Sequence, residues 1–267
     1  MGALDEYLQI LPEVNVATMH YPISGFYDLD CCQPLDAFGV WFREYVSREV
    51  SERYPGVELS GLRQVVKRLW QSSGQLLDIA QFSRACELDE AVFMSCLEVA
   101  IATDLFFSIP AYHRIGHLEV RDRSRLYVRN RISDGRVQPW IDRNTDLAAA
   151  VDPQTIWTQT IANRLTATVE KHQLYHWCDR RRRKIDFVIA AADRTHCTTI
   201  ECIPDTTQYS SRCLKVFRRL YPRGQNFIFT PQVSIPNYTR FDNLGVIFCT
   251  PEQWQSGQVE TIVAQVS

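Results

Sequence analysis

Two acidic residues, Asp186 and Glu201, lie in apolar runs that could pair as a β-hairpin. The runs read KIDFVIA and TTIECI, and a turn centred between Asp193 and Arg194 would place residues whose numbers sum to 387 opposite each other. Asp186 and Glu201 then form a cross-strand pair. Adjacent carboxylates repel, so a hairpin keeps them together mainly where a divalent cation or a basic partner neutralises them. A metal site is one interpretation, and independent, solvated or arginine-paired carboxylates are the other.

Side chains alternate between the two faces of a strand, so the same register predicts the faces of the hairpin. The face expected to point into the core carries Phe187, Ile189, Ile200 and Cys202. The opposite face would be shared by Asp186, Val188, Glu201 and Ile203.

The charges are unevenly distributed, although the net charge of the 267 residues is only −2. Residues 1–58 hold ten acids against three arginines, whereas 113–143 hold eight arginines against four acids. Clustered cations beside an acidic segment are typical of a surface that faces phosphate, and a solvated loop is the alternative for any single run. The candidate nucleic-acid-binding residues are Arg180, Arg181, Arg182, Arg183, Lys184, Arg121, Arg123 and Arg125.

The elements around these residues divide the chain into two halves. Helical spacing over 60–72, 78–86 and onward from Asp89, followed by the strand-like runs LFFSI and RLYV, predicts a winged helix-turn-helix at about 60–131 within a helical region 1–145. A three-helix connector without a ligand is the alternative. The third helix would turn Glu90, Ser95 and Glu98 outward, which suits phosphate poorly, so the wing arginines are expected to make most nucleic-acid contacts.

The order of elements in the second half of the chain predicts an α/β domain over 146–267. A helix carrying Ile156, Ile161, Leu165 and Val169 precedes the hairpin, and the end of a second helix, at 216–221, precedes strands at 227–230 and 246–249.

The hairpin resembles the core of PD-(D/E)xK nuclease-like domains, whose site has an Asp in one strand and a Glu-x-Lys motif in the next. The chain as a whole resembles an uncharacterised domain found C-terminal to the P-loop module of many prokaryotic AAA-type ATPases. The resemblance extends over nearly the whole sequence and rests on the order of several loose motifs, namely LDEYLQILPEV, WFREYVSREV, LFFSIPAYH, RLYVRNRISDG, TIWTQTIANRL and YHWCDRRRRKIDFVI. It implies a restriction-endonuclease-like α/β fold after the winged helix.

Two of the four positions that the resemblance implies for a nuclease site are replaced. Asp186 and Glu201 match, but Thr158 stands where the family helix usually offers Glu, and Ile203 stands where the motif usually ends in Lys. Beside these four positions, Gln159 stands where the family helix usually offers Asn. That lysine is understood to activate the attacking water and stabilise charge on phosphate, which an aliphatic side chain cannot do. Asp186, Glu201, Thr158 and Ile203 therefore form a vestigial site that binds metal weakly at most.

Several other classes of function are disfavoured. The sequence has no GxxxxGK[ST] motif, so any ATPase partner would be a separate polypeptide. No apolar run approaches a membrane span and the start is unlike a signal peptide, so a cytoplasmic protein is expected. The nine cysteines never form CxxC and indicate reduced thiols. His172 and His176 have the spacing of a two-histidine metal face on a helix, but no third ligand is suitably spaced.

These patterns predict a nucleic-acid-binding or assembly protein, without a cofactor, whose nuclease-like domain is inactive. One alternative is an active nuclease in which Mg²⁺ is held by Asp186 and Glu201, and a displaced Lys184 or Lys215 replaces the missing lysine. A second alternative is a protein-interaction subunit that does not bind DNA.

Overall fold

The computed structural model describes residues 37–113, 124–129, 153–191 and 196–259. The chain forms two compact units, one of Met1–Leu59 with Asn130–Ala150, and one of Ser60–Arg129 with Val151–Ser267. In the first unit the structure describes the helix α2 (Ala37–Tyr45) and the π-helical turn η1 (Val46–Val50). The boundary predicted at 145/146 lies outside the described residues, and residues 60–129 belong to the same unit as the α/β region.

The second unit begins with three helices and a two-stranded ribbon. They are α3 (Leu59–Gln71), α4 (Ile79–Ala85), α5 (Glu90–Ala102), β1 (Phe106–Ile109) and β2 (Arg125–Val128). The Asp78 side chain caps α4 by accepting a hydrogen bond from the Gln81 amide, and Glu87 at φ 54° helps to form the short turn before α5. An isolated bridge between Leu76 and Arg125 joins the α3–α4 connection to the ribbon. The helices and strands predicted over this region are confirmed.

The rest of the second unit is a six-stranded mixed sheet with helices, so the predicted mixed α/β class is confirmed. Its order is β3-β4-β5-β6-β8-β7, with β5, β6 and β8 parallel and the other neighbours antiparallel. The elements are α8 (Pro153–Thr168), β3 (Leu174–Cys178), β4 (Lys184–Ala190), β5 (Cys197–Cys202), η4 (Thr206–Gln208), α9 (Arg212–Leu220), β6 (Asn226–Phe229), β7 (Asn237–Phe241), β8 (Leu244–Cys249) and α10 (Pro251–Gln255).

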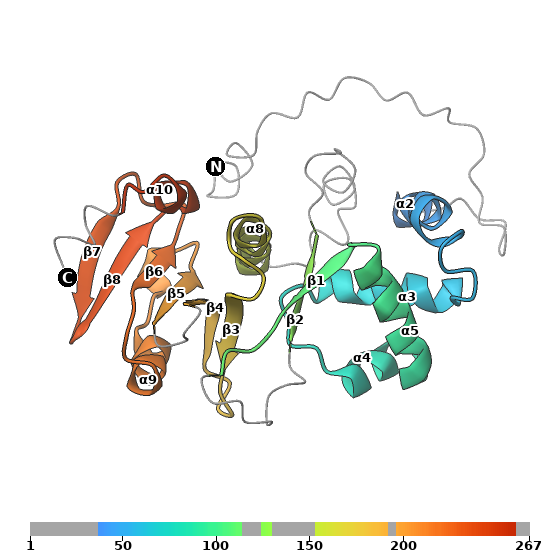
Figure 1. Cartoon of the computed structure of the whole chain (residues 1–267), viewed down its shortest axis with the longest axis horizontal. Helices are drawn as coiled ribbons and strands as arrows, with labels where there is room; N and C mark the ends of the chain where they lie inside the picture. Colours follow the sequence, from blue (N-terminus) through green and yellow to red (C-terminus); the bar gives the residue numbers. More distant parts are fainter. Residues whose placement is uncertain (1–36, 114–123, 130–152, 192–195, 260–267) are drawn as a thin grey trace, which may run out of the picture. The chain divides into compact units, whose positions relative to one another are not determined.

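Helices cover both faces of this sheet (Figure 1). On one face, Leu214 and Phe217 of α9 join a buried cluster with Val188 and Ile228. On the other, Trp157 of α8 donates its indole N–H to the Phe229 carbonyl at 3.0 Å, and Trp254 of α10 packs on the Phe229 ring. Because Ile228 and Phe229 are adjacent in β6, α9 lies opposite α8 and α10. The β4–β5 hairpin is therefore covered by helices on both faces, so the face predicted to lie opposite the core is also buried.

The strands β3 and β7 were not predicted from the sequence. β3 reads LYHWC and contains His176, which is fully buried, so His172 and His176 do not share a helix face as proposed. β7 is exposed along most of its length, and it lacks the apolar alternation by which a strand is recognised. No described helix is long and apolar enough to cross a membrane.

A buried arginine of α9 holds the ends of β5 and β6 together. Arg218 is 6% exposed, and its guanidinium donates to the Asn226 side chain and to the carbonyls of Cys197, Tyr221, Arg223 and Gln225. Carbonyl oxygens therefore satisfy this charge. Gly224 lies in the same turn at φ +125°, where an added Cβ would be 2.0 Å from the Cys197 oxygen.

We expect Arg218→Met to lower the free energy of unfolding by about 3 kcal/mol, because the buried carbonyls would lose their donors while the apolar stem is kept. Chemical denaturation with far-UV circular dichroism measures the change. Arg219→Met is the matched control, since Arg219 is exposed on the same helix and its replacement should cost less than about 0.5 kcal/mol. Equal effects of the two substitutions would contradict the role given to Arg218.

Candidate functional site

A β-bulge determines where Asp186 lies. The predicted hairpin register is confirmed, because Phe187 pairs with Ile200 and Val188 with Thr199. On the other side of β4, the register with β3 shifts between the pairs Tyr175–Val188 and Trp177–Ile185. The shift inserts an extra residue into β4 and interrupts its alternation, since Ile185 and Val188 belong to the same buried cluster although they are three residues apart.

The bulge turns Asp186 away from the face predicted for it. Asp186 contacts Arg125 of β2, and the adjacent Phe187 packs on Tyr127 of the same strand. Glu201 instead lies on the same side of β5 as Thr199 and Ile203. The Thr199 hydroxyl donates to the Asn226 side chain, and Ile203 packs on the buried cluster that contains Leu214 and Phe217 of α9. The prediction that Asp186, Val188, Glu201 and Ile203 share one face therefore fails at Asp186.

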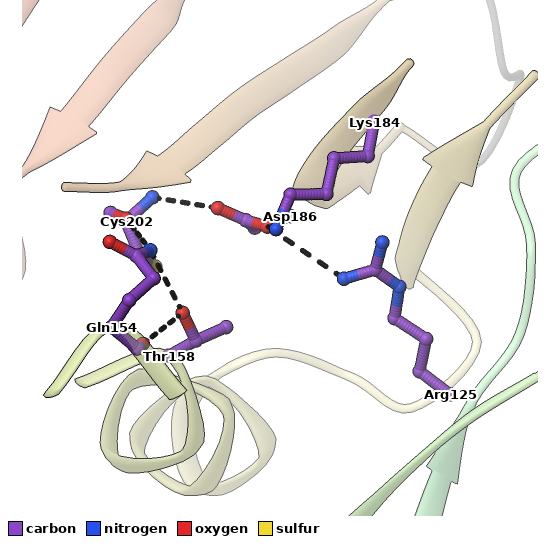
Figure 2. Close-up of polar contacts among 6 residues, drawn as sticks. All are labelled: Arg125, Gln154, Thr158, Lys184, Asp186 and Cys202. Carbon is purple, nitrogen blue, oxygen red and sulfur yellow. Dashed lines mark hydrogen bonds and ion pairs between the residues drawn. The ribbon is translucent and has the colours of Figure 1, made fainter. Parts of the chain in front are cut away.

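The Asp186 carboxylate bridges two strands through different oxygens (Figure 2). Its Oδ2 accepts a hydrogen bond from the Cys202 amide at 3.0 Å. Its Oδ1 lies 3.7 Å from Nη1 of Arg125 and 3.4 Å from Nζ of Lys184. Asp186 thus replaces a strand carbonyl at the end of the β4–β5 ladder and, at the same time, is the counter-ion of two cations.

The helix α8 completes this end of β5. Gln154 donates its side-chain amide to the Cys202 carbonyl and, at 3.3 Å, to the Thr158 hydroxyl. Thr158 is buried and donates its own hydroxyl to the Gln154 carbonyl at 2.8 Å. Asp186 and Gln154 therefore bind the two backbone polar groups of Cys202, the amide and the carbonyl (Figure 2).

Glu201 is the most perturbed acid of the site. Burial, together with the negative charge of Asp186, raises its pKa to about 8, and Lys184 opposes the shift. Its Oε1 is buried and accepts no hydrogen bond from the described residues. A carboxyl in such surroundings is held in its neutral form at pH 7. Asp186 and Glu201 thus interact electrostatically without facing each other across the strands.

The donors at this site do not fit a divalent metal. Mg²⁺ needs several oxygen ligands in an octahedron. One oxygen of Asp186 is bound to an amide and the other faces two cations, while the Thr158 hydroxyl is bound to a carbonyl and Ile203 packs against the apolar cluster. Among the described residues, no group of three or more His, Cys, Asp or Glu could hold a metal ion.

The basic turn, residues 180–184, presents cations at the end of the hairpin formed by β3 and β4. Arg180, Arg181, Arg182 and Lys184 are exposed. The turn is ordered by Asp179, whose carboxylate accepts hydrogen bonds from the amides of Arg181 and Arg183 and from the Arg183 guanidinium. Although slight burial raises the pKa of Asp179, these bonds and the Arg183 charge outweigh it and lower the pKa. Arg183 is thus half-buried and engaged, whereas its four neighbours face solvent.

The structure describes only one of the three arginines predicted to contact nucleic acid near the wing. Arg121 and Arg123 lie outside the described residues. Arg125 is 6% exposed and ion-paired with Asp186, so the prediction that it contacts phosphate is corrected: its backbone lies in β2 and its guanidinium points into the protein. Lys215, considered as a replacement for the missing lysine, forms an ion pair with Asp242.

The sequence did not reveal the roles of Gln154, Asp179 and Arg125. The position of Gln154 one helical turn before Thr158 was a usable signal, as was that of Asp179 directly before the run of arginines. No local pattern pointed to the Arg125–Asp186 pair, which joins residues 61 positions apart.

Neither the models of known protein families nor the curated proteins contain a match to this sequence.

The raised pKa of Glu201 predicts a pH dependence of stability. The Glu201 carboxyl ionises near pH 4.5 in the unfolded chain and near 8 in the folded one. Its contribution to the free energy of unfolding is therefore fully present below pH 4.5 and is lost as the pH rises through 8. The loss is at most about 1.4 kcal/mol per pH unit. Denaturant unfolding at a series of pH values should show that Glu201→Gln removes this part of the dependence.

The exposed Glu170 provides the matched control, because Glu170→Gln should leave the curve of the wild-type protein unchanged. Parallel curves for Glu201→Gln and the wild-type protein between pH 4.5 and 8 would contradict the assignment.

Proposed function

We propose that this chain is a nucleic-acid-binding protein and that its α/β domain, nuclease-like in descent, binds the phosphate backbone without cutting it. The observation that carries the proposal is the basic turn, where the exposed Arg180, Arg181 and Arg182 stand on a hairpin end fixed by Asp179. A preorganised group of cations binds a polyanion with less loss of side-chain entropy than a mobile loop. The hydrogen bonds of Asp179 supply that order.

The helical part of the second unit supports the same proposal. Three helices followed by an antiparallel ribbon, with a bridge from the α3–α4 connection to β2, are the parts expected of a winged helix-turn-helix. Glu90, Ser95 and Glu98 of α5 are exposed, which gives the would-be recognition helix an acidic surface. We therefore assign phosphate contacts to the basic turn and to Arg121 and Arg123, and protein contacts to α5, including those with a separate ATPase.

The non-catalytic part of the proposal follows from the chemistry of the vestigial site. An attacking water needs a base or a metal to activate it, and the phosphate needs a cation beside it. Thr158 and Ile203 supply neither, and the cations near Asp186 are already its partners. The second candidate is a nuclease that uses Lys184, and the observation in its favour is the distance of 3.4 Å between the Lys184 ammonium and the Asp186 carboxylate.

We expect Arg181→Ala with Arg182→Ala to weaken binding to every DNA sequence. Removal of one phosphate contact should reduce the slope of log K against log[salt] by about 0.9 on duplex DNA, because fewer counterions are released. Fluorescence anisotropy over a series of salt concentrations gives both affinity and slope. Arg240→Ala on β7, at the opposite edge of the sheet from β3, is the matched control and should change neither. An unchanged slope in the double variant would assign the turn to structure or to a protein partner.

We also expect the purified protein not to cleave linear, branched or single-stranded DNA with Mg²⁺ or Mn²⁺. Removal of a single positioned electrostatic group costs on the order of 10²–10³ in rate, and here two positions of the site are replaced. Because Ile203 packs on the α9 side of the sheet and Thr158 belongs to α8 on the other side, the double change Thr158→Glu with Ile203→Lys should not restore metal-dependent nicking. Cleavage by the wild-type protein that Asp186→Ala abolishes would instead establish the nuclease.

A further inference from the structure

We propose that Arg125 occupies the role of a metal ion at this site: its guanidinium is the resident counter-charge of Asp186 and fixes the β1–β2 ribbon to the β4–β5 hairpin. Asp186 and Arg125 are then positioning residues that join the helical and α/β parts of the second unit. This proposal concerns the assembly of the fold and does not depend on nucleic-acid binding.

The burial of both partners is the first step of the argument. Their side chains are 7% and 6% exposed, and Nη1 of Arg125 lies 3.7 Å from Oδ1 of Asp186. A guanidinium stays protonated in proteins, so it cannot escape the cost of burial by losing its proton. A buried guanidinium needs either a set of carbonyl acceptors, as Arg218 has, or an opposite charge beside it, and for Arg125 that charge is Asp186. Lys184 approaches the same oxygen, but its side chain is half exposed and water can solvate its ammonium, so it depends on Asp186 less than the buried guanidinium does.

The commitment of the remaining donors is the second step. The second oxygen of Asp186 is bound to the Cys202 amide, and the Thr158 hydroxyl is bound within α8. A divalent ion would therefore have to displace the guanidinium from Oδ1 and would gain no second carboxylate there, since Glu201 follows the alternation of Thr199 and Ile203 toward the α9 side of the sheet. The guanidinium brings its positive charge on a strand that is already fixed by β1 and by the bridge to Leu76.

The consequence is a link between distant parts of the chain. Arg125 lies at the start of β2, two residues after Arg123, and Asp186 lies two residues after Lys184 of the basic turn. One carboxylate thereby holds the root of the ribbon and the end of that turn.

A double-substitution cycle tests the proposal. Asp186→Asn keeps an acceptor for the Cys202 amide but leaves the guanidinium without a counter-charge, and should lower Tm on the order of 10 °C. Arg125→Met keeps the apolar stem and removes the charge. The double variant should melt at a higher temperature than Asp186→Asn alone, because the uncompensated cation is gone. A double variant that folds where Asp186→Asn does not would support the proposal equally.

Additive decreases of Tm in the cycle would overturn the proposal. The control cycle is Arg164→Met with Glu252→Gln, an ion pair whose side chains are 34% and 54% exposed, and it should be additive with small shifts. A second measurement applies even where the variants fail to fold: millimolar Mn²⁺ should leave the Tm of the wild-type protein unchanged. A rise in Tm with Mn²⁺ would show that a metal can take the site and would contradict the role given to Arg125.

Discussion

A buried guanidinium needs either a set of carbonyl acceptors or an anion beside it, and the second of these requirements governs the centre of the second unit. Arg125 reaches the interior from β2, and Asp186 is the acid that it contacts there. The pair therefore limits how the ribbon can lie on the sheet, in a way that apolar packing alone does not, because an apolar contact tolerates small slides and a buried ion pair does not. The neighbouring ring contact between Tyr127 and Phe187 adds area to the same junction.

The β-bulge makes the pair possible. With regular alternation, Asp186 would point to the α9 side, where Val188 and Ile228 fill a dry cluster. The extra residue in β4 turns Asp186 toward β2 and leaves Glu201 on the α9 side, so two acids of one hairpin enter different surroundings. Asp186 finds an amide and two cations there, whereas Glu201 finds little compensation and its pKa rises to about 8. A local irregularity of the backbone thus gives the two acids different electrostatic surroundings.

Much of the fold could be predicted from local patterns, but the site could not. The helices α3, α4, α5 and α8 follow from apolar spacing within short segments, and the register of β4 on β5 follows from a turn centred between Asp193 and Arg194. β3 was not predicted because LYHWC does not alternate between apolar and polar residues, and β7 was not predicted because it is an exposed edge strand. The bulge is a property of β3 and β4 together, and the Arg125 pair joins residues of two different sheets, so neither leaves a trace in any single window of sequence.

The arginines illustrate why a count of charges does not locate a binding surface. Arg218 is held by carbonyl oxygens, Arg125 by a carboxylate and Arg183 by Asp179, and these three serve the fold. Arg181 and Arg182 are exposed on a turn whose backbone those bonds have ordered. A phosphate in solution can displace water from exposed guanidinium groups at small cost, but it cannot extract one that is buried against a carboxylate. Under the proposed function, the arginines that meet a polyanion at this end of the sheet are therefore the exposed Arg181 and Arg182, and not the buried or carboxylate-paired ones.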